Sequence, residues 1–303
     1  MVTAKKKKDS PAVLTPELLR RWPLPQPDED GDKEDRGRVL VVGGALEMPG
    51  AVILAATAAL RAGAGKLQIA TCKSISHAVA VAVPEARVFA LAETKDGAIA
   101  ASAASLLTEH AKEAQALLIG PGMIDKQAVE RLMKSVLPKL KDLTVVLDAT
   151  ALSCFAGAPD LLSRAKVNAI LTPHAGEMAG MLKIDKSEVA RDPLSIAKSA
   201  AKELDSVVAL KGRVTYIVAP DGEAYQNRAG NVGLATSGSG DTLSGIIAGL
   251  AARGADPLRA AAWGVYLHAK AGDRLAKKMG RLGFLARELL DEIPALMAQS
   301  GKA

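Results

Sequence analysis

Hydrophobic residues recur along this chain in short uninterrupted runs that alternate with longer alanine-rich stretches. The first run is 39–42, and similar runs occupy 66–70, 87–91, 116–119, 144–147, 168–171 and 206–210. The stretches between them, such as 51–62, 98–111 and 125–140, have the composition and spacing of helices. The runs are apolar throughout instead of alternating with polar residues, as expected of strands that are buried on both faces. The pattern predicts an α/β fold whose mostly parallel central sheet carries helices on both faces.

The two ends of the chain have a different pattern. Residues 1–36 are first basic, then rich in proline and then acidic, which predicts an irregular N-terminal arm. Residues 216–219 and 224–226, joined through a Pro-Asp-Gly turn, predict an antiparallel hairpin, and helices at 257–277 and 284–298 follow it. Because no repeat or linker divides the remainder, we expect a single domain over 37–303.

Composition excludes several classes of protein. The chain has 303 residues of which 49% are hydrophobic, enough for a sizeable core, whereas aromatic residues make up only 3% and offer no base-stacking platform for nucleic acid. Part of the net charge of +6 comes from Lys5–Lys8. Cys72 and Cys154 lack the spacing of a disulfide framework or zinc site, which fits a reducing compartment. The longest uncharged apolar stretch, Met48–Leu60, is shorter than the roughly 20 residues of a membrane span, and no secretory signal is evident. We therefore expect a cytoplasmic protein without nucleic-acid or membrane partners.

The most informative segment is the glycine-rich loop that runs into an apolar helix at Asp241. The first amides of a helix point outward without partners and, together with the helix dipole, bind anions such as phosphate. Gly238 and Gly240 would let a phosphate approach the backbone closely. Asp241 would then take a proton from a substrate hydroxyl that attacks the terminal phosphate. The alternative is an ordinary glycine turn with Asp241 as the helix cap.

Other strand ends carry further candidate residues. Gly43-Gly44 ends the first predicted strand and Pro49-Gly50-Ala51 opens the next helix, while another strand ends in Gly120-Pro121-Gly122. Each could be an ordinary turn, and none has the GxGxxG spacing of a dinucleotide-binding dehydrogenase. Asp148 also follows a strand, where an acid either contacts metal or phosphate or caps the following helix. All of these loops lie where open α/β sheets bind ligands.

Two more motifs contain candidate polar residues. In Leu171–Glu177, His174 follows a proline at a strand end and precedes Glu177 by three residues, which favours a functional histidine over a surface histidine that caps a helix. In Lys211–Thr215 the lysine can lie over a nucleotide phosphate or ribose, although many exposed Lys-Gly pairs are only turns. The other histidines, at positions 77, 110 and 268, lie in predicted helices and are interpreted as structural or exposed.

Taken in order, these motifs resemble the ribokinase-like superfamily and most closely its ADP/ATP-dependent NAD(P)H-hydrate dehydratase family. The resemblance covers roughly residues 37–298. It implies a ribokinase-like three-layer αβα sandwich that dehydrates the S form of hydrated NADH or NADPH at the expense of ADP or ATP. A kinase of the same fold that acts on a vitamin-precursor alcohol is the alternative, and a non-catalytic nucleotide-binding module is a third interpretation.

The resemblance also assigns roles to individual residues. The small-molecule substrate would contact Ala51, Gly122, His174 and the catalytic Asp241, whereas the nucleotide would be held by Lys211, Gly212, Arg213, Val214, Thr215, Gly238, Ser239 and Gly240. Mg²⁺ is expected on the phosphates, with no dedicated protein ligands identified. The family resemblance further implies a homo-oligomer, for example a tetramer. Ala45 and Met48 depart from the family pattern, and the epimerase domain of many bacterial relatives is expected to reside elsewhere. The motifs fit either nucleotide as donor and either hydrate as substrate.

Overall fold

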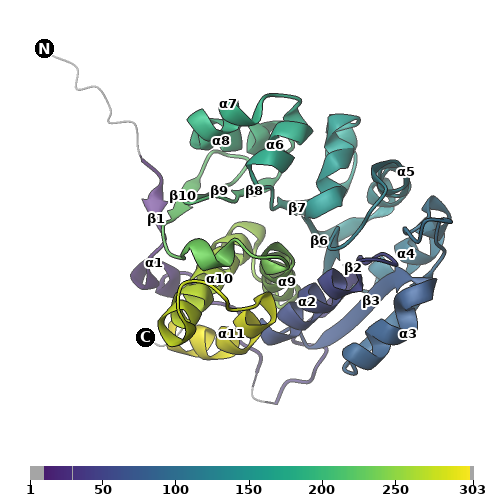
Figure 1. The fold of residues 1–303 in the computed structure, drawn as a ribbon, viewed down its shortest axis with the longest axis horizontal. Helices are drawn as coiled ribbons and strands as arrows, with labels where there is room; N and C mark the ends of the chain where they lie inside the picture. Colours follow the sequence, from purple (N-terminus) through teal and green to yellow (C-terminus); the bar gives the residue numbers. More distant parts are fainter. Residues whose placement is uncertain (1–9, 29, 301–303) are drawn as a thin grey trace, which may run out of the picture.

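The structure is a computed structural model that describes residues 10–28 and 30–300. Its described strands form one sheet in the order β1-β10-β9-β8-β7-β6-β5-β2-β3-β4 (Figure 1). The strands are β1 Ala12–Val13, β2 Arg38–Val42, β3 Lys66–Cys72, β4 Ala86–Leu91, β5 Ala116–Ile119, β6 Lys141–Leu147, β7 Lys166–Leu171, β8 Val207–Leu210, β9 Thr215–Val218 and β10 Ala224–Asn227. Strands β2 to β8 pair in parallel, and β9 is antiparallel to both β8 and β10. Each predicted run is a strand, and the predicted hairpin is confirmed.

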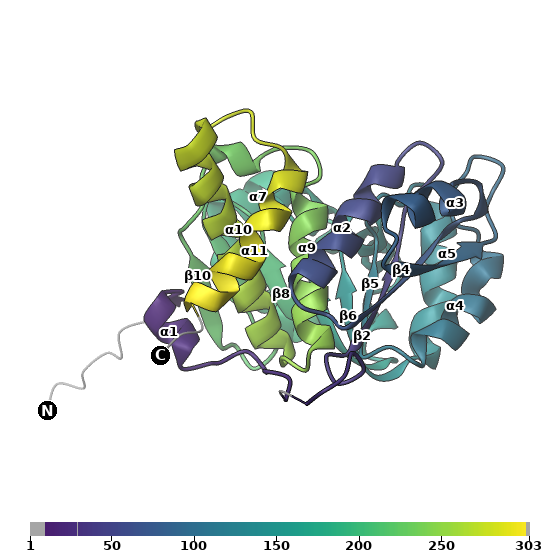
Figure 2. The ribbon, with the colours of Figure 1, turned by 90° about the horizontal axis from the view of Figure 1, so that it is seen from below.

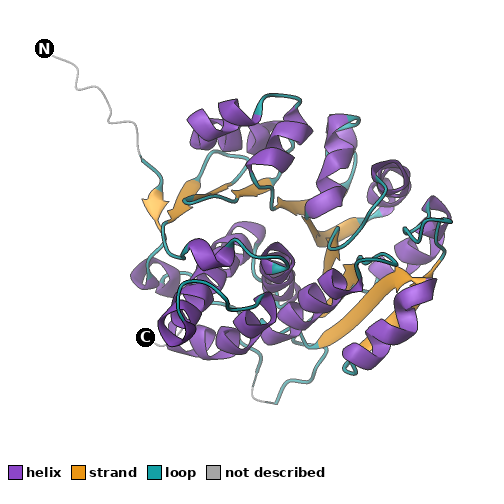
Figure 3. Ribbon diagram, viewed as in Figure 1, coloured by secondary structure: helices purple, strands orange, loops and turns teal. Residues whose placement is uncertain are grey.

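Helices cover both faces of the sheet (Figures 1 and 3). One face carries α1 Pro16–Arg20, α2 Pro49–Arg61, α3 Lys73–Ala82, α9 Ser239–Ala252, α10 Pro257–Met279 and α11 Ala286–Ser300. The other carries α4 Ala104–Ala111, α5 Lys126–Val136, α6 Ala175–Leu182, α7 Lys186–Arg191 and α8 Pro193–Glu203. This is the three-layer arrangement predicted from the sequence. No helix in the described ranges combines the length and apolarity needed to cross a membrane.

Close packing of α2 and α9 positions the glycine-rich loop (Figure 2). A Cβ atom at Gly245 would lie 2.8 Å from the carbonyl carbon of Ala55, and one at Gly249 would lie 2.8 Å from Cα of Ala59. The two helices therefore approach backbone to backbone, which only glycine allows here. Because both pairs ascend in the same direction, the helices are parallel and their N-termini lie at the same end. That end adjoins the carboxyl ends of the parallel strands.

The prediction of an irregular arm over 1–36 is wrong for part of that segment. Residues 12–13 form β1, which pairs with β10, and residues 16–20 form α1, whose Leu19 is fully buried. The indole Nε1 of Trp263 donates to the carbonyl oxygen of Trp22 at 2.8 Å. These partners lie more than 200 residues away in sequence, so local composition gave no sign of them. Residues 1–9, with the basic run Lys5–Lys8, lie outside the described residues.

Candidate active site

Two glycine-containing loops meet at the carboxyl ends of β2 and β5. The amide of Gly44 donates to the carbonyl oxygen of Pro121 at 2.7 Å. Gly122 is buried and has φ +66°, and a Cβ there would lie 2.8 Å from Cβ of Ala51. The positive φ and the lack of space explain why glycine occupies this position. Ala51 and Gly122 are far apart in sequence, and both are predicted to contact the substrate. The fold brings them together in one wall of the candidate site.

The glycine-rich loop forms an open helix N-terminus. Gly238, with φ +85°, is the N-cap residue of α9, and no side chain of a described residue caps this helix. Apart from a contact of the Asp241 amide with its own carboxylate, the amides of Gly240 and Asp241 form no hydrogen bond with a described residue. They are therefore free to bind an anion, with the helix dipole adding to the attraction. The alternative that Asp241 is the helix cap is wrong, because Gly238 occupies the cap position and Asp241 lies in the first turn.

A partly buried ion network lies beside this helix end. The Nζ atom of Lys211, directly after β8, is 3.0 Å from Oδ1 of Asp148 and 3.7 Å from Oε2 of Glu177. Asp148 is buried at the end of β6 and also accepts from Oγ1 of Thr172 at 2.8 Å. Burial acts to lower the pKa of Lys211, but attraction to Asp148, Glu177 and Asp241 outweighs it and raises that pKa. Lys211 therefore stays positively charged.

From the sequence, Asp148 is compatible with either a ligand-binding acid or a helix cap. It occupies the N-cap position of the 3-10 helix η3 (Ala149–Ala156), but its side chain forms no capping hydrogen bond. The carboxylate instead accepts from Nζ of Lys211 and orients it. A Cβ built on Gly240 would lie 3.6 Å from Nζ of Lys211 and 4.0 Å from Oδ2 of Asp148, so this ion pair faces the start of α9.

The electrostatic environment tunes Asp241. Burial and the negative charge of Asp148 raise its pKa to about 6, while the charge of Lys211 opposes the rise. A carboxylate with this pKa is largely ionised at neutral pH and is a stronger base than an ordinary aspartate. Asp241 is partly buried and lies beside the first amides of α9. A base at this position would adjoin a phosphate bound to these amides.

His174 occupies the N-cap position of α6. Its Nδ1 atom accepts from the amides of Gly176 at 3.0 Å and Glu177 at 3.2 Å, and the carboxylate of Glu177 accepts from the amide of His174 at 2.7 Å. This is the capping arrangement that the sequence left as the alternative. The side chain is nevertheless 58% exposed, so the ring remains accessible. A cavity of about 440 Å³ between α6 and η3 is lined by His174 and Glu177.

Comparison with known proteins identifies the family. The family model described as NAD(P)H-hydrate dehydratase matches residues 39–295. The chain belongs to the NAD(P)H-hydrate dehydratase family. It is 49% identical to the ADP-dependent (S)-NAD(P)H-hydrate dehydratase of Xanthomonas campestris over 94% of this chain and 96% of that protein. It is 42% identical to the bifunctional NAD(P)H-hydrate repair enzyme of Moorella thermoacetica over 91% of this chain but only 52% of that protein.

A solved structure of the same family has a similar fold. The ADP/ATP-dependent NAD(P)H-hydrate dehydratase of Bacillus subtilis, co-crystallised with ATP and Mg²⁺, is similar with a TM-score of 0.80 and 32% identity. The match covers 95% of this chain and 98% of that one. The family and the ribokinase-like fold predicted from the motifs are therefore confirmed.

Of the segment predicted to hold the nucleotide, only the first residue takes part in the ion network of Asp148 and Glu177. Residues 211–215 lead from β8 into β9, and of these five described residues only Lys211 makes an ion pair with Asp148. Gly212 and Arg213 are exposed, and Val214 and Thr215 are partly buried. Their role in nucleotide binding remains a prediction.

Ser239 differs from its glycine neighbours in what it offers a ligand. Its Oγ atom is 3.0 Å from Nε2 of His268, and its amide donates to the carbonyl oxygen of Thr236 at 3.2 Å. Both groups are therefore engaged within the protein. Burial lowers the pKa of His268 to about 4, so the imidazole is neutral. His268 is buried, as a structural histidine is, and its contact with the loop has no sequence signal because it lies in the middle of α10.

The described residues hold no group of three or more His, Cys, Asp and Glu side chains placed to bind a metal ion. A Mg²⁺ ion carried on nucleotide phosphates needs no such group, because phosphate oxygens and water supply most of its ligands.

Proposed function

We propose that this protein is an ADP-dependent dehydratase of the S form of hydrated NADH and NADPH. The observation that carries the proposal is the position of Asp241, a carboxylate with a pKa of about 6 at the open N-terminus of α9. The family match and the 49% identical relative, which is an ADP-dependent (S)-NAD(P)H-hydrate dehydratase, support the choice of reaction and donor.

The residues present suit a mechanism that converts a poor leaving group into a good one. Asp241 takes the proton of the hydrate hydroxyl while that oxygen attacks the terminal phosphorus of ADP, and AMP departs. The lone pair of the ring nitrogen then expels the hydroxyl oxygen as inorganic phosphate. Loss of a proton from the neighbouring ring carbon restores the dihydronicotinamide double bond. The products are the reduced dinucleotide, phosphate and AMP.

The transferring phosphoryl group would bind between α9 and Lys211. The free amides of Gly240 and Asp241 would donate to its oxygens, and the charge of Lys211 would balance the negative charge that spreads over them. Gly238 would keep the approach clear of side chains, and Ser239 would hold the loop through His268. The nucleoside would extend along Gly212–Thr215. A Mg²⁺ ion on the phosphates would add to charge neutralisation.

The hydrated nicotinamide would lie against Ala51, Gly122 and His174. Because Nδ1 of His174 accepts two amide hydrogens, a ring proton lies on Nε2, which is 3.5 Å from Oε1 of Glu177 and would donate to a ligand. The cavity beside His174, about 440 Å³, has room for another part of the dinucleotide. In this pose the hydroxyl would lie between Asp241 and the wall formed by Ala51 and Gly122.

The test is an assay of (S)-hydrated NADH with ADP, with ATP and without nucleotide. We expect the reduced-nicotinamide absorbance to grow only when a nucleotide is present, faster with ADP, and AMP and phosphate to form in equal amounts. The Asp241→Asn variant is the matched control and is expected to be inactive. A stable phosphorylated alcohol formed from another substrate, with no gain of absorbance from the hydrate, would show a kinase instead.

A further inference from the structure

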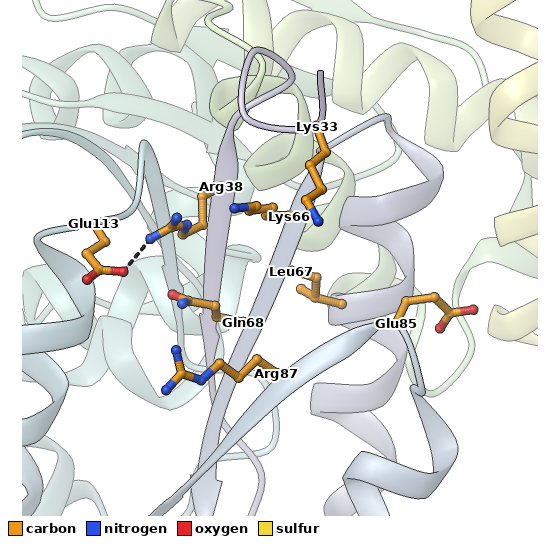
Figure 4. Close-up of a pocket in the computed structure, with 9 residues that line it drawn as sticks. Lys33, Arg38, Lys66, Leu67, Gln68, Glu85, Arg87 and Glu113 are labelled. Atoms are coloured by element: carbon orange, nitrogen blue, oxygen red, sulfur yellow. Dashed lines mark hydrogen bonds and ion pairs between the residues drawn. The ribbon is translucent and has the colours of Figure 1, made fainter. Parts of the chain in front are cut away.

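A second cavity lies where strands β2, β3 and β4 begin, at the end of the sheet opposite the candidate active site (Figure 4). Its volume is about 310 Å³. Arg38 is the first residue of β2, Lys66 is the first residue of β3, and Arg87 is the second residue of β4. The candidate active site lies at the carboxyl ends of β2 and of β5 to β8, so the two sites lie at opposite ends of the strands. Nothing in the proposed reaction uses this cavity.

Strand register places the polar side chains of the cavity on one face. Arg38 pairs with Lys66 across β2 and β3, and Gln68 pairs with Arg87 across β3 and β4. Because Lys66 and Gln68 are two residues apart, all four side chains leave the same face of the sheet. Neighbouring strands are about 4.8 Å apart, so this group lies within reach of one small molecule. Figure 4 shows Gln68 between the guanidinium groups of Arg38 and Arg87.

Gln68 is the most unusual residue of this group. Its side chain lies in a strand whose other residues are mostly buried and apolar, and only 6% of the residue is exposed. Its Oε1 atom is buried without a hydrogen-bond partner among the described residues. A buried amide oxygen without a partner destabilises a fold, so its presence at the wall of a cavity points to a ligand that supplies the missing hydrogen bond.

The charges show what kind of ligand suits the cavity. Arg38 is paired with Glu113 and Glu34, and Lys66 is paired with Glu34, whereas Arg87 has no acidic partner among the described residues. The guanidinium of Arg87 instead lies 4.8 Å from the centre of the Phe89 ring, which holds it beside the cavity. In the cavity lining the cations of Lys33, Arg38, Lys66 and Arg87 outnumber the carboxylates of Glu85 and Glu113. This excess of positive charge favours an anion with several oxygens, and arginine binds phosphate with a two-pronged geometry.

We propose that this cavity is a second ligand site, which binds a small phosphate monoester through Arg38, Lys66 and Arg87 and hydrogen-bonds one of its hydroxyl groups through Gln68. The Oε1 atom of Gln68 is covered, so the side-chain amide turns toward the cavity before a ligand hydroxyl donates to it, and the phosphate provides the acceptor oxygens that Arg87 lacks. The volume of about 310 Å³ accommodates a sugar phosphate.

The test is calorimetric titration of the full-length protein with ribose 5-phosphate, inorganic phosphate and ribose. Saturating ADP and Mg²⁺ are present throughout to occupy the other site. We expect ribose 5-phosphate to bind at one site and to bind more tightly than phosphate or ribose. Gln68→Leu and Arg87→Gln are each expected to weaken this binding about tenfold or more, since each removes a direct partner. The matched control, Arg131→Gln on the exposed side of α5, removes the same charge away from the cavity and is expected to leave binding unchanged.

Stability measurements keep the result interpretable. Gln68→Leu removes an unpartnered buried amide, so its melting temperature is expected to equal or exceed that of the wild type, and lost binding then cannot be attributed to unfolding. The proposal is overturned if ribose 5-phosphate produces no binding heat at millimolar concentration, or if both cavity variants bind as well as the control. Equal affinity for phosphate and its ester, unaffected by Gln68→Leu, would overturn the role given to Gln68.

Discussion

Replacing Asp241 with asparagine separates its contribution to catalysis from its contribution to stability. The variant keeps the shape and the helix but loses the proton acceptor, so turnover is expected to fall by about 10²–10⁴-fold. Nucleotide binding is expected to remain largely intact, because Lys211 and the free amides of α9 are unchanged. At the same time the variant should become more stable than the wild type above neutral pH.

The magnitude follows from the raised pKa. Burial and Asp148 raise the pKa of Asp241 from 3.8 to about 6, so the folded state binds the proton more tightly than the unfolded state does. Ionised Asp241 therefore destabilises the fold: the penalty is absent below pH 3.8, grows between pH 3.8 and about 6, and is complete above that. Two pKa units correspond to about 3 kcal/mol, and partial exposure of the side chain reduces this to about 1–2 kcal/mol.

The assay is urea unfolding of both proteins at pH 4 and pH 8, together with the rate of hydrate conversion. The free energy of unfolding of Asp241→Asn is expected to exceed that of the wild type by about 1–2 kcal/mol at pH 8 and to approach it at pH 4. Wild-type activity in the variant would refute the role of Asp241 as base. A stability difference that does not change with pH would refute the electrostatic explanation.

Further predictions concern the neighbours of Asp241. Lys211→Met leaves Asp148 buried without its cation and is expected to lower the free energy of unfolding by about 3–5 kcal/mol. A Lys211→Met, Asp148→Asn double variant is expected to recover much of this loss, and urea titration measures both variants. Gly240→Ala is expected to change the free energy of unfolding by no more than about 1 kcal/mol, since its Cβ meets Nζ of Lys211 at an ordinary 3.6 Å. Its KM for nucleotide is expected to rise about tenfold, because a methyl group enters the phosphate site. Gly238→Ala, at φ +85° and with a Cβ only 2.5 Å from Leu54, is expected instead to lose at least about 1–2 kcal/mol in thermal unfolding; equal behaviour of the two alanine variants would contradict the distinction.

Several features of this protein could be derived from its sequence because their causes are local. The uninterrupted apolar runs predict strands buried on both faces, and the observed parallel sheet has this property. The glycine-rich loop and Asp241 lie within a few residues of the helix amides that they accompany, so the segment itself specifies an open helix N-terminus. The ordered set of motifs was sufficient to identify the family.

Tertiary structure decided the features that depend on residues distant in sequence. Lys211 and Asp148 are 63 residues apart and meet only because β6, β7 and β8 are neighbours in the sheet. The raised pKa of Asp241 depends on this meeting and on burial, neither of which a local motif contains. Likewise, Leu19 is buried because its partners come from remote elements, although its own segment is polar and rich in proline. Sequence therefore determined which groups could act, and the packing of strand ends determined their charge, orientation and basicity.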